Sequence, residues 1–312
     1  MITISRYNSE YSAVWDAFVD ASKNGTFMLK RGYIDYHSNR FMDYSLMFYN
    51  DNDLVALFPA SQHGTEIRSH GGLTYGGIIT NLKMTVQLML SIFEALKEYW
   101  IKNGISRIIY KRVPSIYYTY PSDEDLYALF RNGAKLIRRD VSTTIHIPNR
   151  PRFSERRRRG VKKALKNGIV VKESTDFNTY INLLADVLRT HHNATPVHTS
   201  IEISLLAGRF PENIKLYAAY EDDKMLAGVL MYLTPNVAHT QYIANSEEGR
   251  KCGALDIVMD YLINECYSSK EYFDFGISTE NEGLFLNEGL ISQKQEFGGR
   301  GIVYDMYEYK LY

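Results

Sequence analysis

The chain has 312 residues, 45% hydrophobic and 23% charged, so it is long enough for two domains with buried cores and too apolar to be disordered. Its 36 lysines and arginines balance its 36 aspartates and glutamates, so no overall charge favours nucleic acid or an anionic membrane. The two cysteines exclude a disulfide framework and a cysteine-based metal site. We see no signal peptide, and apolar runs such as 86–93 are too short to cross a bilayer, so we expect a cytoplasmic protein without membrane insertion.

The first half predicts a helix, a hairpin, a strand, a long helix, a strand, a short helix and a strand. Two apolar runs around the turn Asp51-Asn52-Asp53 indicate the hairpin. Ser122 is the expected N-cap of the short helix, and Gly133 is its expected stop. In chain order, the predicted elements cover residues 9–25, 44–50 with 54–61, 72–80, 83–102, 106–114, 122–133 and 134–147.

The second half repeats the same order of elements, which indicates an internal duplication. A hairpin is again predicted around a polar turn, here at residues 221–224. Pro148 and Pro151 interrupt the pattern between the halves, so we expect domains at 1–148 and 149–312. In chain order, the predicted elements cover residues 177–192, 213–220 with 225–234, 237–246, 251–267, 271–278, 281–290 and 301–312.

Three motifs add to this element order: RRGVKKALKNGIVV at 158–171, YFDFGIS at 272–278 and GLISQKQEFGG at 289–299. With them the chain resembles the FemABX-like, GNAT-related transferases. The resemblance implies an α/β fold (α+β, mixed sheets) of two tandem GNAT-like domains, with the active site in the second. The helical coiled-coil arm of the peptidoglycan-bridge members is not visible.

A basic cluster opens the second half, where four consecutive arginines at 156–159 are followed by further lysines. On a helix, Val161, Ala164 and Leu165 would lie together and the cations would cover the remaining surface. One interpretation is a solvated basic face. The other is a phosphate-binding site, because the planar arginine fork binds phosphate oxygens in pairs. The phosphate-binding candidates are Arg156, Arg157, Arg159 and Lys163.

The glycine-rich stretch 68–79 has two interpretations. Glycines within a strand mark a bulge or a close approach to the backbone. The structural alternative is a turn followed by a bulge. The functional alternative is the floor of a ligand site, and we slightly favour it because polar residues concentrate there. The substrate-binding candidates are Ser69, His70, Thr74 and Tyr75.

Three histidines are candidates for a general base, because imidazole has a pKa near neutrality. His192 ends a predicted helix, and His198 would share a helical face with Glu202 if a helix began near it. His239 lies on a predicted central strand, with Gln241, a further substrate-binding candidate, two residues further on the same face. The alternatives are a helix-end charge, a capping contact and a satisfied core histidine. No standard metal-ligand motif is present.

The resemblance also assigns roles near the end of the second half. Arg250 and Gly253 fall where GNAT enzymes bind the coenzyme A pyrophosphate, although Leu255 replaces a small residue there. Asp274 ends a strand, where it is expected to orient the acceptor. Lys294 matches a FemABX lysine that neutralises phosphates of the substrate or donor.

The sequence therefore predicts an acyl- or aminoacyltransferase that acts on an amine or hydroxyl. The resemblance implies acyl-coenzyme A or aminoacyl-tRNA as donor, and a phosphate-bearing acceptor such as a nucleotide-linked sugar or a bacterial cell-envelope precursor. Two alternatives remain. One is a non-catalytic ligand-binding protein on a degenerate transferase fold. The other is an RNA-binding factor that uses the arginine run.

Overall fold

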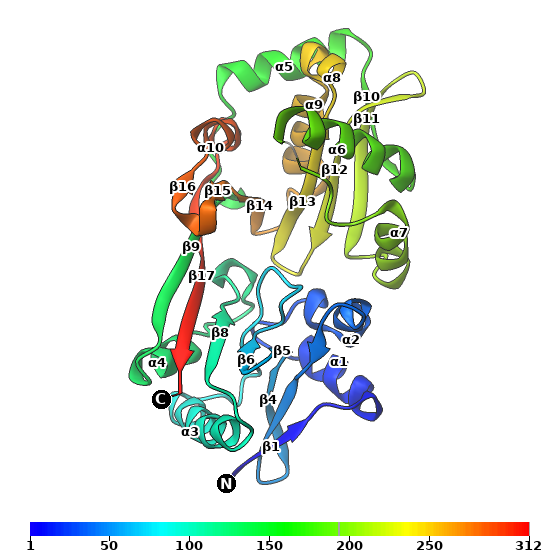
Figure 1. The fold of residues 1–312 in the computed structure, drawn as a ribbon. Coiled ribbons are helices and arrows are strands. Elements are labelled where there is room, and N and C mark those ends of the chain that lie inside the picture. Colours follow the sequence, from blue (N-terminus) through cyan, green and yellow to red (C-terminus); the bar gives the residue numbers. More distant parts are fainter. Residues whose placement is uncertain (193, 312) are drawn as a thin grey trace. The chain divides into compact units, whose positions relative to one another are not determined.

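The computed structural model describes residues 1–192 and 194–311. The chain forms two compact units, which are described separately here (Figure 1). Unit 1 comprises Met1–Asp140, Asn281–Leu284 and Val303–Tyr312, and unit 2 comprises Val141–Glu280 and Phe285–Ile302. This division differs from the predicted boundary at residue 148. The predicted mixed α/β class is confirmed.

Unit 1 contains a small antiparallel sheet and a second group of strands. The small sheet has the order β1 (Ile2–Arg6), β3 (Leu46–Asn50), β4 (Asp53–Phe58) and β7 (Ile79–Thr80). The second group has the order β17 (Arg300–Lys310), β8 (Arg107–Lys111), β6 (Glu66–Arg68), β5 (Ser61–His63) and β2 (Met42–Asp43). Strand β6 pairs with β8 in parallel, and Gly76 continues this pairing in a single bridge to Arg112.

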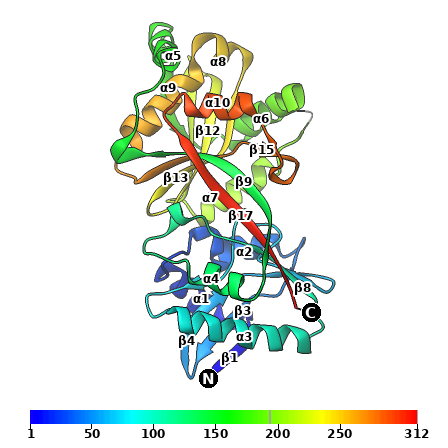
Figure 2. The ribbon, with the colours of Figure 1, turned by 90° about the vertical axis from the view of Figure 1, so that its left-hand side faces the viewer.

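Helix α3 (Val86–Lys102) provides one wall of the core of unit 1 (Figure 2). Thr85 caps its first turn, and its apolar residues recur every three or four positions, so one face is buried against Phe58 and Tyr110. The other helices and helical turns of unit 1 are η1 (Ser9–Tyr11), α1 (Ser12–Asp20), η2 (Phe27–Leu29), α2 (Arg31–Ile34), η3 (Asp35–His37), η4 (Ser115–Tyr117), α4 (Glu124–Arg131) and η7 (Asn281–Gly283).

Unit 2 is built on one sheet in which only the pair β13–β14 is parallel. Its order is β10 (Val170–Ser174), β11 (Ile214–Glu221), β12 (Lys224–Leu233), β13 (Val237–Asn245), β14 (Tyr272–Ile277) and β9 (Lys135–His146). The last six residues of β9, from Val141 onward, belong to unit 2, as do the first three of β17. A separate small hairpin joins β15 (Thr279–Glu280) to β16 (Phe285–Leu286).

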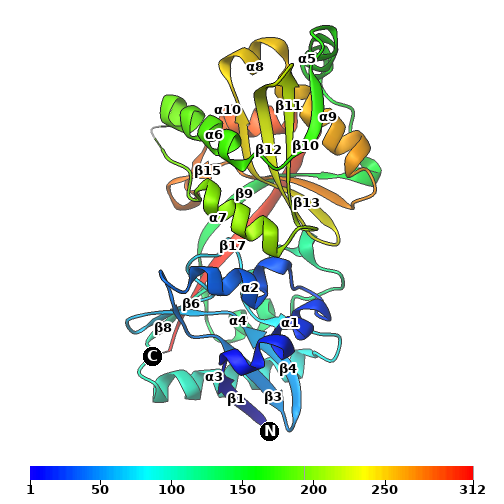
Figure 3. The ribbon, with the colours of Figure 1, turned by 90° about the vertical axis from the view of Figure 1, so that its right-hand side faces the viewer.

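Helices cover both faces of the sheet of unit 2 (Figures 1 and 3). On β12, Ala227 and Val229 belong to the core beneath α9, whereas Gly228 between them faces the ring of Tyr180 in α6. This alternation is the period of two expected of a strand with both faces buried. The helices are η5 (Ile147–Asn149), α5 (Glu155–Lys166), α6 (Phe177–His192), α7 (Ser200–Arg209), α8 (Glu247–Cys252), α9 (Ala254–Tyr261), the π-helical turn η6 (Leu262–Cys266) and α10 (Glu288–Gln295).

Several predicted elements are wrong in detail. The predicted strand 72–80 is regular only at β7, and the predicted helix 281–290 is the hairpin β15–β16 followed by α10. The predicted helix 251–267 is interrupted at Gly253, whose φ of +84° ends α8. Ser122 does not cap α4, since its hydroxyl contacts that of Thr80.

Among the described residues, no helix combines the length and the apolar character needed to cross a bilayer. The same part of the chain contains no group of three or more His, Cys, Asp or Glu side chains arranged to hold a metal ion.

Candidate active site

His239 and Asp274 form a hydrogen-bonded pair on the two parallel strands of unit 2. The pairing of β13 with β14 extends only from Val237 with Tyr272 to His239 with Asp274. His239 Nδ1 lies 2.7 Å from Asp274 Oδ2. The pair therefore stands at the last paired position, where the two strands begin to separate.

Asp274 is completely buried, and strand β9 supplies two further donors to it. Ser142 Oγ donates to Oδ1 at 2.5 Å and Thr144 Oγ1 donates to the same oxygen at 2.7 Å. Burial alone would raise the pKa of Asp274, but the hydrogen bonds from His239, Ser142 and Thr144 hold it below its ordinary value. An ionised Asp274 accepts from Nδ1–H of His239, which leaves Nε2 as the basic nitrogen of that neutral ring.

Beyond this pair the strands diverge, and irregular backbone lies on both sides of the gap. The register of β13 shifts against β12 at Gln241, and that of β14 shifts against β9 between Asp274 and Ile277. Gly276 has a φ of +75°, and a Cβ there would lie 3.4 Å from Cε1 of His239. A side chain at this position would therefore crowd the imidazole edge. The shift at Gln241 also breaks the predicted alternation with His239.

A pocket of about 610 Å³, here called the splay pocket, opens in unit 2 between the diverging strands. This volume is in the range of small-molecule sites. Ile243 and Asn245 line it from β13, and Phe275 lines it from β14. The other lining residues are Arg156, Arg157, Val187, Gly249, Arg250, Gly253, Leu255, Asp256, Met259, Gly289, Leu290, Ser292, Gln293, Lys294, Glu296 and Phe297.

The His239–Asp274 pair lies on the face of the sheet away from α9, whereas most of the lining of the splay pocket comes from α5, α8, α9 and α10. Phe273 and Phe275 belong to the core beneath α9, so Asp274 between them points to the other face. His239 lies beside Ala238, which is in the same core, and therefore also points away from it.

Lys294 connects the pocket wall to the backbone beside His239. Its Nζ donates to the carbonyl oxygens of Gly276 at 2.8 Å and Ile277 at 2.7 Å. Burial lowers its pKa to about 8, although Asp274 opposes that shift. The ammonium has three donors, so one N–H remains without a partner among the described residues.

The basic cluster divides into one buried arginine and an exposed basic face of α5. Arg157 is buried and lies 2.8 Å from Asp256 and 2.7 Å from Glu296, with its guanidinium over the ring of Phe297. Its charge is already matched by two carboxylates, so it joins α5 to α9 and α10. Arg156, Arg159 and Lys163 are exposed, and Arg156 lines the splay pocket. Leu165, expected on the buried face, is 62% exposed.

Arg250 in the last turn of α8 and Gly253 between α8 and α9 also line the splay pocket. Arg250 is exposed and has no ion-pair partner among the described residues. A Cβ at Gly253 would lie 2.3 Å from the carbonyl oxygen of Gly160, so this glycine allows the turn to contact α5. Leu255, which departs from the GNAT pattern, lines the pocket from α9.

The other predicted histidines lie in different settings. His198 is buried, and its Nδ1 lies 2.6 Å from the hydroxyl of Tyr242 on β13. It precedes α7 rather than sharing a helical face with Glu202, because Glu202 completes a capping box with Thr199. His192 ends α6, and its side chain lies outside the described residues.

The glycine-rich stretch of unit 1 forms internal contacts. Ser69 and Tyr75 are buried, and they bond to the backbone of Lys111 and to the hydroxyl of Thr26, respectively. His70 is also buried, and burial lowers its pKa to about 3, with the nearby His37 contributing. Thr74 is exposed. These contacts favour the structural interpretation of the stretch.

Ser142 and Thr144 were not predicted as site residues. Their only sequence signal is that two hydroxyls lie two residues apart on one predicted strand, and so on one face. Hydroxyls are common in strands, so this signal carries no functional meaning until Asp274 is known to lie opposite them.

Unit 2 thus combines a mixed sheet whose parallel strand pair separates, a histidine–carboxylate pair at that point and a pocket large enough for a small molecule. Residues 151–282 match the family model of the acetyltransferase (GNAT) domain. This match covers 132 of the 312 residues, and it confirms the predicted resemblance to FemABX-like, GNAT-related acyltransferases.

Solved structures share the fold over nearly the whole chain. FemX is 12% identical with a TM-score of 0.69, covering 99% of this chain and 97% of its own. L-PGS from Bacillus licheniformis is 12% identical with a TM-score of 0.63, covering 98% and 93%. A tandem GNAT protein from the clavulanic acid biosynthesis pathway is 10% identical with a TM-score of 0.55, covering 100% and 99%. No curated protein matches the chain.

Proposed function

We propose that this enzyme transfers an acyl or aminoacyl group from a donor in the splay pocket to an amine or hydroxyl beside His239. The observation that carries the proposal is the His239–Asp274 pair, 2.7 Å apart, at the point where β13 and β14 separate. A buried, ionised carboxylate is the group that orients an imidazole as a base.

In this mechanism His239 Nε2 accepts the proton of the acceptor while the acceptor nitrogen or oxygen attacks the carbonyl carbon of the donor. Asp274 remains ionised and stabilises the imidazolium that forms. The tetrahedral intermediate then collapses, the bond to the donor sulfur or oxygen breaks, and the imidazolium returns a proton to that leaving group. Asp274 acts on the imidazole rather than on the acceptor, in contrast to the role expected from the sequence.

Acyl-coenzyme A is the donor that we favour. The exposed Arg250 and Arg156 line the splay pocket, where they can pair with phosphates, and Lys294 has an unused N–H at the pocket wall. The exposed basic face of α5 supports aminoacyl-tRNA as the alternative donor. The resemblance to FemABX-like transferases implies a cell-envelope precursor or nucleotide-linked sugar as acceptor, in a cytoplasmic setting.

Calorimetric titration with coenzyme A and acetyl-coenzyme A tests the donor. We expect saturable binding that weakens about tenfold or more in Arg250→Ala, since a charge-assisted hydrogen bond contributes about 1.5–3 kcal/mol. If neither coenzyme A nor acetyl-coenzyme A binds, the proposal of acyl-coenzyme A as donor is wrong. A steeply salt-dependent affinity for aminoacyl-tRNA then favours the alternative.

The base is tested by following the release of coenzyme A thiol from acetyl-coenzyme A, with water as a slow acceptor. We expect His239→Ala to lower this rate by about 10²- to 10⁴-fold while the donor affinity stays unchanged. His146→Ala is the matched control, because His146 is an exposed histidine of the same unit. Donor binding without thiol release in the wild-type protein indicates a non-catalytic binding protein and contradicts the mechanism.

A further inference from the structure

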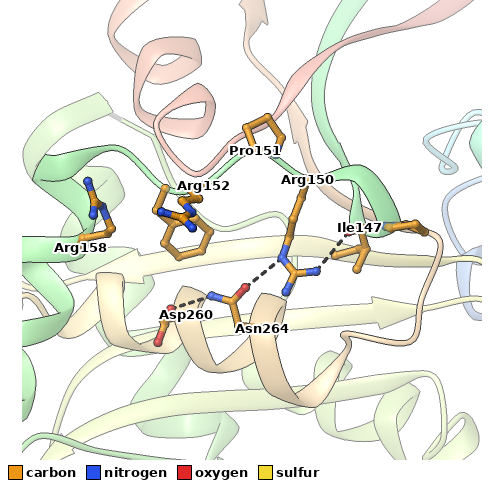
Figure 4. A pocket seen from close by; sticks show the side chains of 9 residues that line it. Ile147, Arg150, Pro151, Arg152, Arg158, Asp260 and Asn264 are labelled. Atoms are coloured by element: carbon orange, nitrogen blue, oxygen red, sulfur yellow. Dashed lines mark hydrogen bonds between the residues drawn. The ribbon is translucent and has the colours of Figure 1, made fainter.

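A second pocket of unit 2, here called the arginine pocket, lies outside the candidate active site (Figure 4). It has a volume of about 430 Å³ and combines the segment that follows β9 with the C-terminal end of α9 and the π-helical turn η6. Its lining residues are Ile147, Pro148, Arg150, Pro151, Arg152, Phe153, Arg158, Asp260 and Asn264. It shares none of these with the splay pocket.

Arg150 is fixed in this pocket by hydrogen bonds that leave part of its guanidinium unused. Nε donates to Asn264 Oδ1 at 3.0 Å, and Nη1 donates to the carbonyl oxygen of Ile147 at 3.1 Å. Asn264 is itself held, because its Nδ2 donates to Asp260 Oδ1 at 2.7 Å. Nη2 of Arg150 has no partner among the described residues, and Figure 4 shows the guanidinium lying over the helix. The side chain is therefore ordered before any ligand binds.

Two more arginines line the same pocket, and they outnumber its carboxylate. Arg152 is exposed and has no ion-pair partner in the part of the chain that the structure describes. Arg158 pairs only with the exposed Glu155 at 2.7 Å, an interaction that water screens strongly. Asp260 is the single acidic side chain in the lining. Three arginines against one carboxylate leave the pocket electropositive.

The remaining wall is apolar. Pro148, Pro151 and Phe153 line it beside the arginines, and they offer contact area to a ring or another flat group. Arginine forks match the geometry of phosphate oxygens, and three of them in one pocket suit two linked phosphates better than one. The charge and the apolar wall together indicate a nucleoside diphosphate group.

We propose that the arginine pocket binds the diphosphate group of a small phosphorylated ligand, separately from the acyl donor. Arg156 and Arg158 lie two positions apart on α5 and therefore face different directions, the first lining the splay pocket and the second the arginine pocket. The helix thus supplies cations to two pockets. This assignment does not depend on the identity of the acyl donor.

The test is calorimetric titration of the full chain with inorganic pyrophosphate and, separately, with ADP and UDP. We expect saturable binding of pyrophosphate at millimolar concentration or below, and tighter binding of at least one nucleotide because of the apolar wall. The double variant Arg152→Ala/Arg158→Ala removes two charge-assisted contacts and should weaken binding at least about tenfold, equivalent to about 1.4 kcal/mol. Both side chains are exposed, so folding should be unaffected. When position 152 of the double variant carries lysine instead of alanine, part of the affinity for pyrophosphate should return.

One control keeps the result specific. Arg189→Ala removes one exposed arginine of unit 2 outside both pockets and should leave the affinity unchanged. The proposal is overturned if the wild-type protein does not bind pyrophosphate, if the double variant binds it as tightly as the wild-type protein, or if Arg189→Ala weakens binding as much as the double variant. Equal affinities for pyrophosphate and both nucleotides would contradict the contribution of the apolar wall.

Discussion

Lys111 in unit 1 and Lys294 in unit 2 are both buried lysines whose ammonium groups donate to backbone carbonyls. Lys111 Nζ donates to the carbonyl oxygens of His70, Gly71 and Leu73, at 3.1, 3.3 and 2.7 Å. Burial lowers the pKa of each lysine to about 8. The two units therefore use the same device, a partly desolvated cation that fixes irregular backbone next to a parallel strand pair.

The difference lies in what occupies the space beyond that strand pair. In unit 1 the glycine-rich segment returns to β8, where Ser69 N donates to Ile109 O and Gly76 N donates to Lys111 O, both at 2.9 Å. The backbone of the glycine-rich segment therefore fills the space beyond the parallel strand pair of unit 1. In unit 2 the pairing stops at His239 and Asp274, and the splay pocket follows. Beyond the parallel strand pair, the same scaffold is therefore closed by backbone in unit 1 and opens into the splay pocket in unit 2.

The largest effect is expected from substitutions of two buried carboxylates, Asp274 in unit 2 and Asp125 in unit 1. Asp274→Asn removes the charge that fixes the tautomer of His239, so we expect thiol release to fall by about 10²- to 10⁴-fold with donor affinity unchanged. The matched variant in unit 1 is Asp125→Asn, since Asp125 accepts a hydrogen bond from Tyr110 at 2.5 Å. It should leave the rate within about twofold. Equal rate losses in both variants would place catalysis outside unit 2 or reveal general unfolding, which thermal melting distinguishes.

A second test compares two glycines in the left-handed region. Gly253→Ala places a Cβ 2.3 Å from a backbone oxygen of α5, whereas Gly104→Ala in unit 1 meets nothing within 4 Å. We expect losses in the free energy of unfolding of about 3 kcal/mol for Gly253→Ala and about 1 kcal/mol for Gly104→Ala. Urea unfolding of each variant provides the measurement. Similar losses at both sites would show that α5 moves away without cost.

The third test exchanges each buried lysine for methionine. Lys294→Met removes a cation from the wall of the splay pocket, so affinity for acetyl-coenzyme A should fall about tenfold, equivalent to about 1.4 kcal/mol. Lys111→Met should leave that affinity unchanged, because Lys111 serves only the backbone of unit 1. Calorimetry measures both values. An equal loss in Lys111→Met would argue against separate roles for the two units.

The smallest effect concerns pH. Each lysine has a folded pKa of about 8, below the unfolded value of 10.5, so between these values the unfolded chain binds more protons. The contribution of each lysine to stability should therefore rise with pH, by about 1 kcal/mol from pH 7 to pH 9. Urea unfolding at both pH values should show this rise reduced in Lys111→Met and in Lys294→Met. An unchanged rise in both variants contradicts the lowered pKa values.

Much of the fold was predictable because its signals are local. Helix α6 spans the predicted residues 177–192, and the hairpins β3–β4 and β11–β12 lie around the predicted polar turns. Errors arose where long-range pairing overrides the local pattern. The segment 72–80 was predicted as a strand, yet much of it is held by contacts with β8 and the side chain of Lys111. Gly253 looks like a tolerated glycine within a helix until α5 is placed against it.

The sequence by itself determined the duplicated order of elements, the acyltransferase resemblance and the candidates His239, Asp274 and Lys294. Periodicity assigns a residue to a face, but it does not say which residue lies opposite. Only the tertiary structure brought Asp274 to His239 and placed Ser142 and Thr144, more than a hundred residues earlier in the chain, against its buried carboxylate. It also matched Arg157 with two carboxylates, because a buried charge must find partners wherever the packing supplies them.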